Sequence, residues 1–193
     1  MLRAVFMRRK GKDMTVKEAI LARRSVRKYN GKPIPEDVLK EIVLAGQIYP
    51  SSKSKFPVQL IVVQDPETIQ KLAACKNAGA GMLKGAAAAI AVIGDAAAAD
   101  GWVEDCSIVM TQMMLRATEL GVGNCWTQMR MRFQKEAEGD APAVTADEAV
   151  RAILNYPEQY QLEAVLSLGM IDQQPEPHTE DYAKAEMVHF EKF

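Results

Sequence analysis

Apolar positions recur along the chain at two spacings, one typical of helices and the other of strands. The helical spacing predicts helices at 15–24, 35–50, 66–75, 102–120 and 145–155. Short runs rich in β-branched or small apolar residues predict strands at 58–64, 87–93, 124–129 and 163–170. Helices and strands follow one another without a regular βαβ alternation. The pattern therefore predicts an α+β fold class, in a single domain over 14–193.

Local capping signals mark several ends of these elements. Thr15 and Glu18 have the spacing of a capping box, and Thr145 caps the start of the helix predicted at 145–155. Asp65 stands where it can cap a short helix, and Gly121 follows the long helix at the position that favours glycine. These signals set the predicted helix boundaries.

The helix at 102–120 is apolar over most of its circumference. We expect it to be buried on several sides, either in the middle of the core or in a large subunit interface. Only a narrow stripe is polar, and its clearest members are Asp105, Gln112, Arg116 and Glu119.

Both ends of the chain differ from the middle. The first thirteen residues carry five basic side chains, and we expect either a disordered basic leader or a start assigned upstream of Met14. The tail over 172–193 is polar and contains prolines, but it ends in VHFEKF. We expect Phe190 and Phe193 to be covered rather than exposed.

Composition excludes several classes of function. Lys and Arg number 24 against 25 Asp and Glu, so the chain has no bulk attraction for nucleic acid or an anionic membrane. The longest apolar run, at 86–93, is too short to cross a bilayer. Cys75, Cys106 and Cys125 are widely spaced, which favours reduced thiols in a cytoplasmic protein over a zinc site or disulfides. No dinucleotide-binding or P-loop glycine motif is present.

Three stretches carry candidate chemistry, and each also has a purely structural interpretation. RRSVR at 23–27 could hold a phosphate, or it could complement the dipole of a helix C-terminus. PSSKS at 50–54 offers hydroxyls for a polyol or phosphate, although polar loops are common. Trp126 with its amide neighbours suits a planar heterocycle, but tryptophan is more often a core residue.

Taken in order, these stretches resemble the nitroreductase family of FMN-dependent reductases. ILARRSVRKYNGKPIPEDVLKEIVLAG is similar to the family's first helix, phosphate motif and second helix. YPSSKSKFPVQLIVV resembles its serine loop and first strand, and LGVGNCWTQ its strand along the flavin. LSLGM and VHFEKF resemble the last strand and the tail, so the resemblance covers nearly everything after Met14.

The resemblance implies a nitroreductase-like mixed sheet flanked by helices, in an intertwined homodimer with FMN at the interface. It places the FMN phosphate at four residues of the first stretch, Arg23, Arg24, Ser25 and Arg27. The ribityl chain and ring would be lined from the partner subunit by the serine stretch, namely Pro50, Ser51, Ser52 and Ser54. The isoalloxazine would lie beside Trp126, Thr127 and Gln128, with a backbone N–H near Gln128 reaching flavin N5.

Some positions depart from the family pattern. Ser54, Phe56 and Val58 stand where the family often has Asn, Gln and Trp. The tail offers only His178 and Lys184 in place of the family's further basic ligands, and neither is assigned a role. The resemblance therefore does not assign the residues on the substrate side of the pocket.

The resemblance also implies the chemistry. FMN would take a hydride from NAD(P)H and pass electrons to a nitroaromatic, a quinone or a similar small conjugated acceptor by a ping-pong mechanism. No protein side chain is predicted to be catalytic, because both histidines lie in the tail and no triad can be assembled. The alternatives are other flavin chemistry, such as dehalogenation or flavin fragmentation, and a flavin-binding redox buffer or sensor.

Overall fold

A four-stranded sheet forms the middle of the computed structural model, which describes residues 14–139 and 141–193. Its strands lie in the order β1 (Val58–Val63), β2 (Ala88–Asp95), β6 (Tyr160–Met170) and β3 (Val122–Gln128). Neighbouring strands pair antiparallel, and an isolated parallel bridge joins Ser25 to Asn124 at the edge of β3. The predicted basic leader, 1–13, lies outside the described residues.

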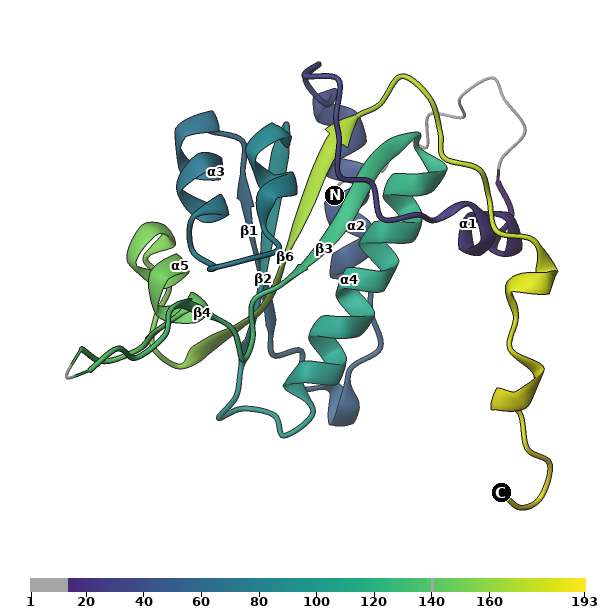
Figure 1. Ribbon diagram of the computed structural model, residues 1–193. Helices are drawn as coiled ribbons and strands as arrows, with labels where there is room; N and C mark the ends of the chain where they lie inside the picture. The colour runs from purple at the N-terminus through teal and green to yellow at the C-terminus, as the bar shows by residue number, and fades with distance from the viewer. Residues whose placement is uncertain (1–13, 140) are drawn as a thin grey trace, which may run out of the picture.

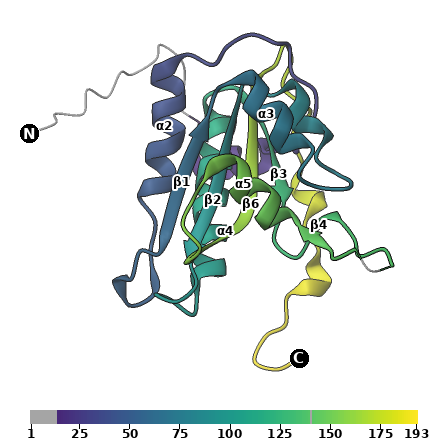
Figure 2. The ribbon, with the colours of Figure 1, turned by 90° about the vertical axis from the view of Figure 1, so that its left-hand side faces the viewer.

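Helices cover both faces of the sheet (Figure 1). On one face lie α2 (Glu36–Gln47) and α4 (Trp102–Glu119), and on the other α3 (Pro66–Ala73) and α5 (Ala146–Leu154). Figure 2, turned by 90°, shows α3 and α5 in front of the strands. The first helix, α1 (Val16–Ala22), packs on α4. The predicted α+β class is confirmed.

Short elements complete the chain, and sequence analysis did not predict them. A separate two-stranded sheet pairs β4 (Phe133–Lys135) with β5 (Val144–Thr145). Four 3-10 turns are found among the described residues: η1 (Ser52–Ser54), η2 (Gly81–Gly85), η3 (Glu180–Tyr182) and η4 (Ala185–Met187).

Strand β2 is buried on both faces, as its small apolar composition predicts. Ala88, Ile90 and Val92 pack toward α2 and α4. The alternate residues Ala89, Ala91 and Ile93 pack toward α3 and α5. This alternation divides the interior into two cores, one on each side of the sheet.

The local capping predictions are confirmed. Thr15 and Thr145 each form a complete capping box, with Glu18 and Glu148. The Asp65 side chain accepts a hydrogen bond from the backbone N–H of Thr68 at the start of α3. Gly121 follows α4 with a φ of +76°, a conformation that side chains with a Cβ rarely adopt.

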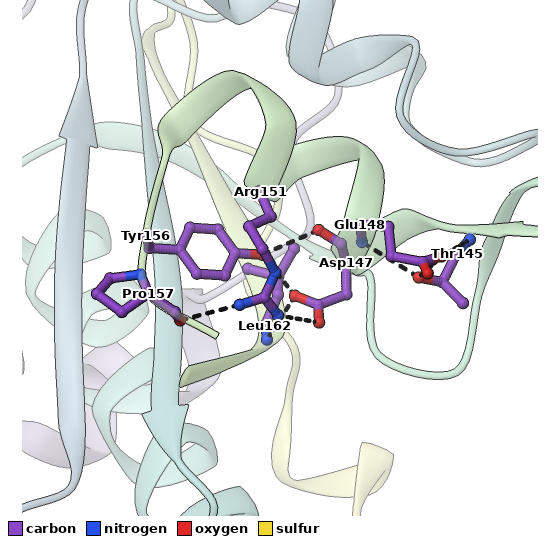
Figure 3. A network of polar contacts seen from close by, with 7 residues as sticks. All are labelled: Thr145, Asp147, Glu148, Arg151, Tyr156, Pro157 and Leu162. Carbon is purple, nitrogen blue, oxygen red and sulfur yellow. Dashed lines mark hydrogen bonds and ion pairs between the residues drawn. The ribbon is translucent and has the colours of Figure 1, made fainter. Parts of the chain in front are cut away.

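A polar network fastens α5 to the beginning of β6 (Figure 3). The carboxylate of Asp147 accepts hydrogen bonds from Arg151 Nη2 (2.7 Å), from the backbone N–H of Leu162 (3.0 Å) and from the hydroxyl of Tyr156. Arg151 also donates to the carbonyl of Pro157 at 2.9 Å and lies over the ring of Tyr156. One carboxylate therefore joins the helix, the following turn and the strand.

Asp105, in the polar stripe of α4, is only 3% exposed, and the hydroxyl of Ser51 reaches it across the fold and donates to Oδ2 at 2.6 Å. One expectation from the sequence is wrong within this chain. Phe190 and Phe193 are exposed, because the tail beyond η3 runs away from the body of the molecule (Figure 1).

Candidate functional site

The predicted phosphate segment lies along the first residues of β3, where Ser25 forms a bridge with Asn124. Arg23 ends α1 in an extended conformation, so the chain leaves the helix as a strand-like segment. The backbone N–H of Val26 donates to the carbonyl of Asn124 at 2.8 Å, and that of Asn30 donates to Met170 at 2.9 Å. The segment is thus fixed to β3 at one point and to the end of β6 at another.

Three of its four predicted ligands influence the Cys125 thiol of β3, and Arg27 Nη1 donates to the carbonyl of Ser25 at 3.2 Å. Burial raises the pKa of the Cys125 thiol, while Arg27, a hydrogen bond from Ser25 and Arg23 act in the opposite direction. Because side chains of an extended segment alternate, Arg24 turns to the other side and donates to the carbonyl of Glu176 at 2.6 Å. The structure therefore brings together Arg23, Ser25 and Arg27, and places Arg24 against the tail.

The tail passes beside these arginines. The backbone N–H of His178 donates to the carbonyl of Leu21 at 2.9 Å. Desolvation, together with the positive charges of Arg24 and Arg23, lowers the pKa of His178. His178 is thereby placed close to the arginine segment, which sequence analysis left open.

Beyond the arginine segment, toward the C-terminal end of β3, the outer edge of this strand is lined with backbone groups. The carbonyl of Asn124 points away from β6, since it accepts from Val26. Residues of an antiparallel strand alternate in the direction of their backbone groups, so Trp126 and Gln128 direct their N–H and C=O groups to the same outer edge. This edge offers a row of donors and acceptors next to a cationic end.

The side chains of Trp126 and Gln128 are held in one hydrogen-bonded chain. Trp126 Nε1 donates to Gln128 Oε1 at 2.7 Å, and Gln128 Nε2 donates to Glu163 Oε1 at 3.2 Å. Thr127 points to the opposite face, is 1% exposed and contacts the sulfur of Met82. Only Trp126 and Gln128 of this predicted group have partly exposed side chains.

Glu163 belongs to this region, and sequence analysis missed it. It is the extra residue of a bulge in β6, because Val92 pairs with Ala164 and Ile93 with Leu162. Its side chain is 5% exposed, and Oε2 has no hydrogen-bond partner within the described residues, with Arg130 Nε at 3.8 Å. The available signal was an acidic residue inside the apolar run LEAVLSL.

The serine loop is a strained turn between α2 and β1. Lys53, Ser54 and Phe56 have φ values of 53°, 52° and 46°, in the left-handed region that non-glycine residues rarely adopt. The hydroxyl of Ser51 accepts from the backbone N–H of Phe56 at 2.9 Å while donating to Asp105. Ser51 therefore anchors the loop, whereas Pro50, Ser52 and Ser54 are exposed.

A single chain does not bring the serine loop to the arginine segment. The two regions lie toward opposite ends of α2, as both ribbon views show (Figures 1 and 2). The structure thus divides the predicted site residues into two separate groups, one at the edge of β3 and one at the end of α2.

The described residues contain no group of three or more His, Cys, Asp or Glu side chains arranged to hold a metal ion. None of the helices in this part of the chain has the length and apolar character needed to cross a membrane.

The fold defines an α+β protein with a cationic segment at one sheet edge, and comparison with known proteins identifies the family. The family model described as "Putative TM nitroreductase" matches residues 15–153. A curated relative from Methanothermobacter thermautotrophicus, named "Putative NADH dehydrogenase/NAD(P)H nitroreductase", is 33% identical over 93% of this chain and 88% of its own length. The chain belongs to this nitroreductase family, as its sequence motifs predict.

Solved structures agree with this assignment. The structure of an FMN-dependent nitroreductase from Clostridium difficile R20291 has a TM-score of 0.83 at 34% identity, covering 91% of this chain and 99% of the other. A protein from Parabacteroides distasonis with the same name as the archaeal relative has a TM-score of 0.80 at 27% identity, covering 92% of this chain and 98% of its own. The predicted nitroreductase-like fold is confirmed.

Proposed function

We propose that this chain is an FMN-dependent oxidoreductase that uses NAD(P)H to reduce a nitroaromatic, a quinone or a similar small conjugated acceptor. The observation that carries the proposal is the edge of β3, where a fixed cationic segment adjoins a row of outward backbone groups. The names of the C. difficile and M. thermautotrophicus relatives support both the cofactor and the reductant.

The donor set fits the phosphate of FMN. Arg23 and Arg27 offer planar guanidinium groups, and Ser25, whose carbonyl accepts a hydrogen bond from Arg27, offers a hydroxyl. Such groups match phosphate oxygens in geometry as well as in charge. Because the backbone at Val26 is already hydrogen-bonded to Asn124, the segment needs little rearrangement to receive the anion.

The rest of the strand edge suits the ring. The N–H groups of Trp126 and Gln128 would donate to the flavin edge, and the indole of Trp126 would border it. Bound FMN would supply the two-electron redox chemistry that links NAD(P)H to the acceptor in a ping-pong sequence. The chain's own residues hold and orient the cofactor and bias its electronics through nearby cations and N–H donors.

The proposal is tested with purified protein under anaerobic conditions. A flavin absorption band should be present or should return on adding FMN, bleach with NADH or NADPH, and recover with a nitroaromatic or quinone. Protein that cannot be loaded with FMN would refute the proposal. Loaded protein that bleaches but transfers electrons to no acceptor would point instead to a redox buffer.

We further propose that the working unit is a homodimer. The half-buried Val103, Ile108 and Leu115 leave apolar surface on α4. The exposed tail carries Met187, Val188, Phe190 and Phe193, and grooves of about 490 and 460 Å³ lie between α2 and the open edge of β1. Open strand edges and apolar patches of this kind are usually covered by a partner.

A second copy would also complete the site, because its serine loop could approach the arginine segment that the first chain's loop does not reach. Obligate interfaces commonly bury more than about 2,000 Å². Sedimentation equilibrium at micromolar concentration should show a dimer with two FMN per dimer. A folded, flavin-loaded monomer would contradict the proposal.

A further inference from the structure

Two glycines face each other across β3 and β6 where the arginine segment crosses the sheet. Gly123 pairs with Gly169 in the strand register. A Cβ built on Gly169 would lie 2.5–2.8 Å from three atoms of Tyr29, and one on Gly123 would lie 2.7 Å from Ile171 Cγ2 and 2.9 Å from Val26 Cγ1. Real Cβ atoms essentially never approach neighbours this closely. We call the paired Gly123 and Gly169 the glycine slot, which Val26 and Tyr29 fill together with Ile171.

Polar contacts hold Tyr29 in this slot. Its hydroxyl lies 2.8 Å from Ser167 Oγ and 3.1 Å from the carbonyl of Val26. Ser167 is fully buried, and its hydroxyl also lies 3.1 Å from the carbonyl of Cys125, to which it can donate. The single proton of the Tyr29 hydroxyl can be donated either to the carbonyl of Val26 or to Ser167 Oγ. Tyr29 is therefore tied to β6 through its ring and hydroxyl, and to the arginine segment through Val26.

We propose that the glycine slot and Tyr29 position the phosphate ligands of this site. Arg27 lies between Val26 and Tyr29, so seating these two side chains fixes the backbone on both sides of it. Arg23 and Ser25 precede Val26, whose N–H is bonded to Asn124. This inference rests on the proposed function, because it takes the anion held by the segment to be the phosphate of FMN.

Packing of this kind stabilises the bound conformation before the ligand arrives. A segment free to move would have to be ordered on binding, which lowers affinity. Displacing the arginine segment should weaken binding of the phosphate more than binding of the flavin ring, because the ring is expected beside Trp126 and Gln128. The slot should therefore control the ratio of FMN to riboflavin affinity, since riboflavin lacks only the phosphate.

The test is Gly169→Ala, with Gly85→Ala as a matched control. A Cβ on Gly85 would meet the same Tyr29 ring at 3.9 Å, an ordinary contact. Dissociation constants for FMN and riboflavin are measured on flavin-free protein of each variant. Gly169→Ala should lower the FMN-to-riboflavin affinity ratio by about tenfold or more, the change expected for losing one charge-assisted hydrogen bond. Gly85→Ala should leave the ratio unchanged.

A double-mutant cycle tests whether the effect runs through Tyr29. Tyr29→Ala should itself lower the ratio, and adding Gly169→Ala in that background should cause no further loss, because the new methyl then has room. If Gly169→Ala lowers the ratio as much in the Tyr29→Ala background as it does in the wild type, the role of Tyr29 is overturned. If Gly169→Ala fails to fold, Tyr29→Leu replaces it, with the same expected fall in the ratio.

The outcomes separate the two proposals. Wild-type protein that binds riboflavin as tightly as FMN would refute the phosphate site itself. Wild-type protein that prefers FMN, together with an unchanged preference in Gly169→Ala or its replacement, would overturn the positioning role while leaving the proposed function intact.

Discussion

The network around Asp147 should be a main source of stability on the α5 side of the sheet. Asp147→Asn keeps the shape of the side chain but replaces one acceptor oxygen with an NH₂ group, which must then face a donor. At least one charge-assisted hydrogen bond is lost, and such bonds contribute about 1.5–3 kcal/mol each. Burial and the adjacent Asp147 carboxylate raise the pKa of Tyr156, so its hydroxyl remains a donor throughout the neutral range.

We expect Asp147→Asn to lower the free energy of unfolding by about 2–3 kcal/mol. For a chain of this length, that corresponds to a fall in thermal midpoint of roughly 4–12 °C. Asp37→Asn is the matched control, because Asp37 is also the second residue of its helix but is exposed. It should lose only the helix-dipole contribution, about 0.3–1 kcal/mol.

Both variants are unfolded by urea and by heat at one fixed protomer concentration, because association changes the apparent stability. The denaturant slope should stay the same while the midpoint moves. If Asp147→Asn and Asp37→Asn differ by less than about 0.5 kcal/mol, the usual spread of surface substitutions, then the network in Figure 3 does not stabilise the fold.

Three further predictions concern the site. Arg27→Ala should weaken FMN binding about tenfold to a hundredfold without affecting riboflavin; equal weakening of both flavins would count against a phosphate contact. Ser51→Ala should cost about 1–3 kcal/mol in urea unfolding by leaving buried Asp105 without its donor, whereas Ser52→Ala should be neutral. Burial, opposed by its bond to Ser167, raises the pKa of Tyr29 from 10.0 to about 12. Because the pKa is higher in the folded chain than in the unfolded one, the protonated hydroxyl of Tyr29 stabilises the fold below pH 10, and this stabilisation is lost as pH rises through 12. Tyr29→Phe should remove one late-titrating tyrosine from an ultraviolet titration, and an unchanged late phase would refute this.

What could be predicted from the sequence was mainly local. The capping boxes of Thr15 and Thr145 are decided within four residues, and the double burial of β2 follows from its small apolar composition. The arginine and serine stretches were also identified from their residue types and order. In each case the chemistry and its signal lie close together in the chain.

What could not be predicted depends on contacts between distant segments. The pattern shows Asp105 only as a polar position of a helix, and only the fold shows that it is buried and that Ser51 reaches it from another element. Glu163 becomes a buried bulge residue only through the pairing register of β2 and β6. The glycine slot likewise exists only because Gly123 and Gly169, far apart in sequence, meet in that register.

The two groups of site residues are built by different means, and this bears on how the site works. The arginine segment is fixed within one chain by backbone hydrogen bonds to β3 and β6 and by the packing of Val26 and Tyr29. The serine loop is fixed by Ser51 and Asp105 in a strained conformation at the far end of α2. Each group is therefore held in place by contacts within its own chain. If two chains associate as proposed, the dimer would join two preformed halves, and cofactor affinity would depend on protomer concentration through association alone. Dilution below the dimer dissociation constant should then release FMN while leaving the secondary structure of each chain unchanged.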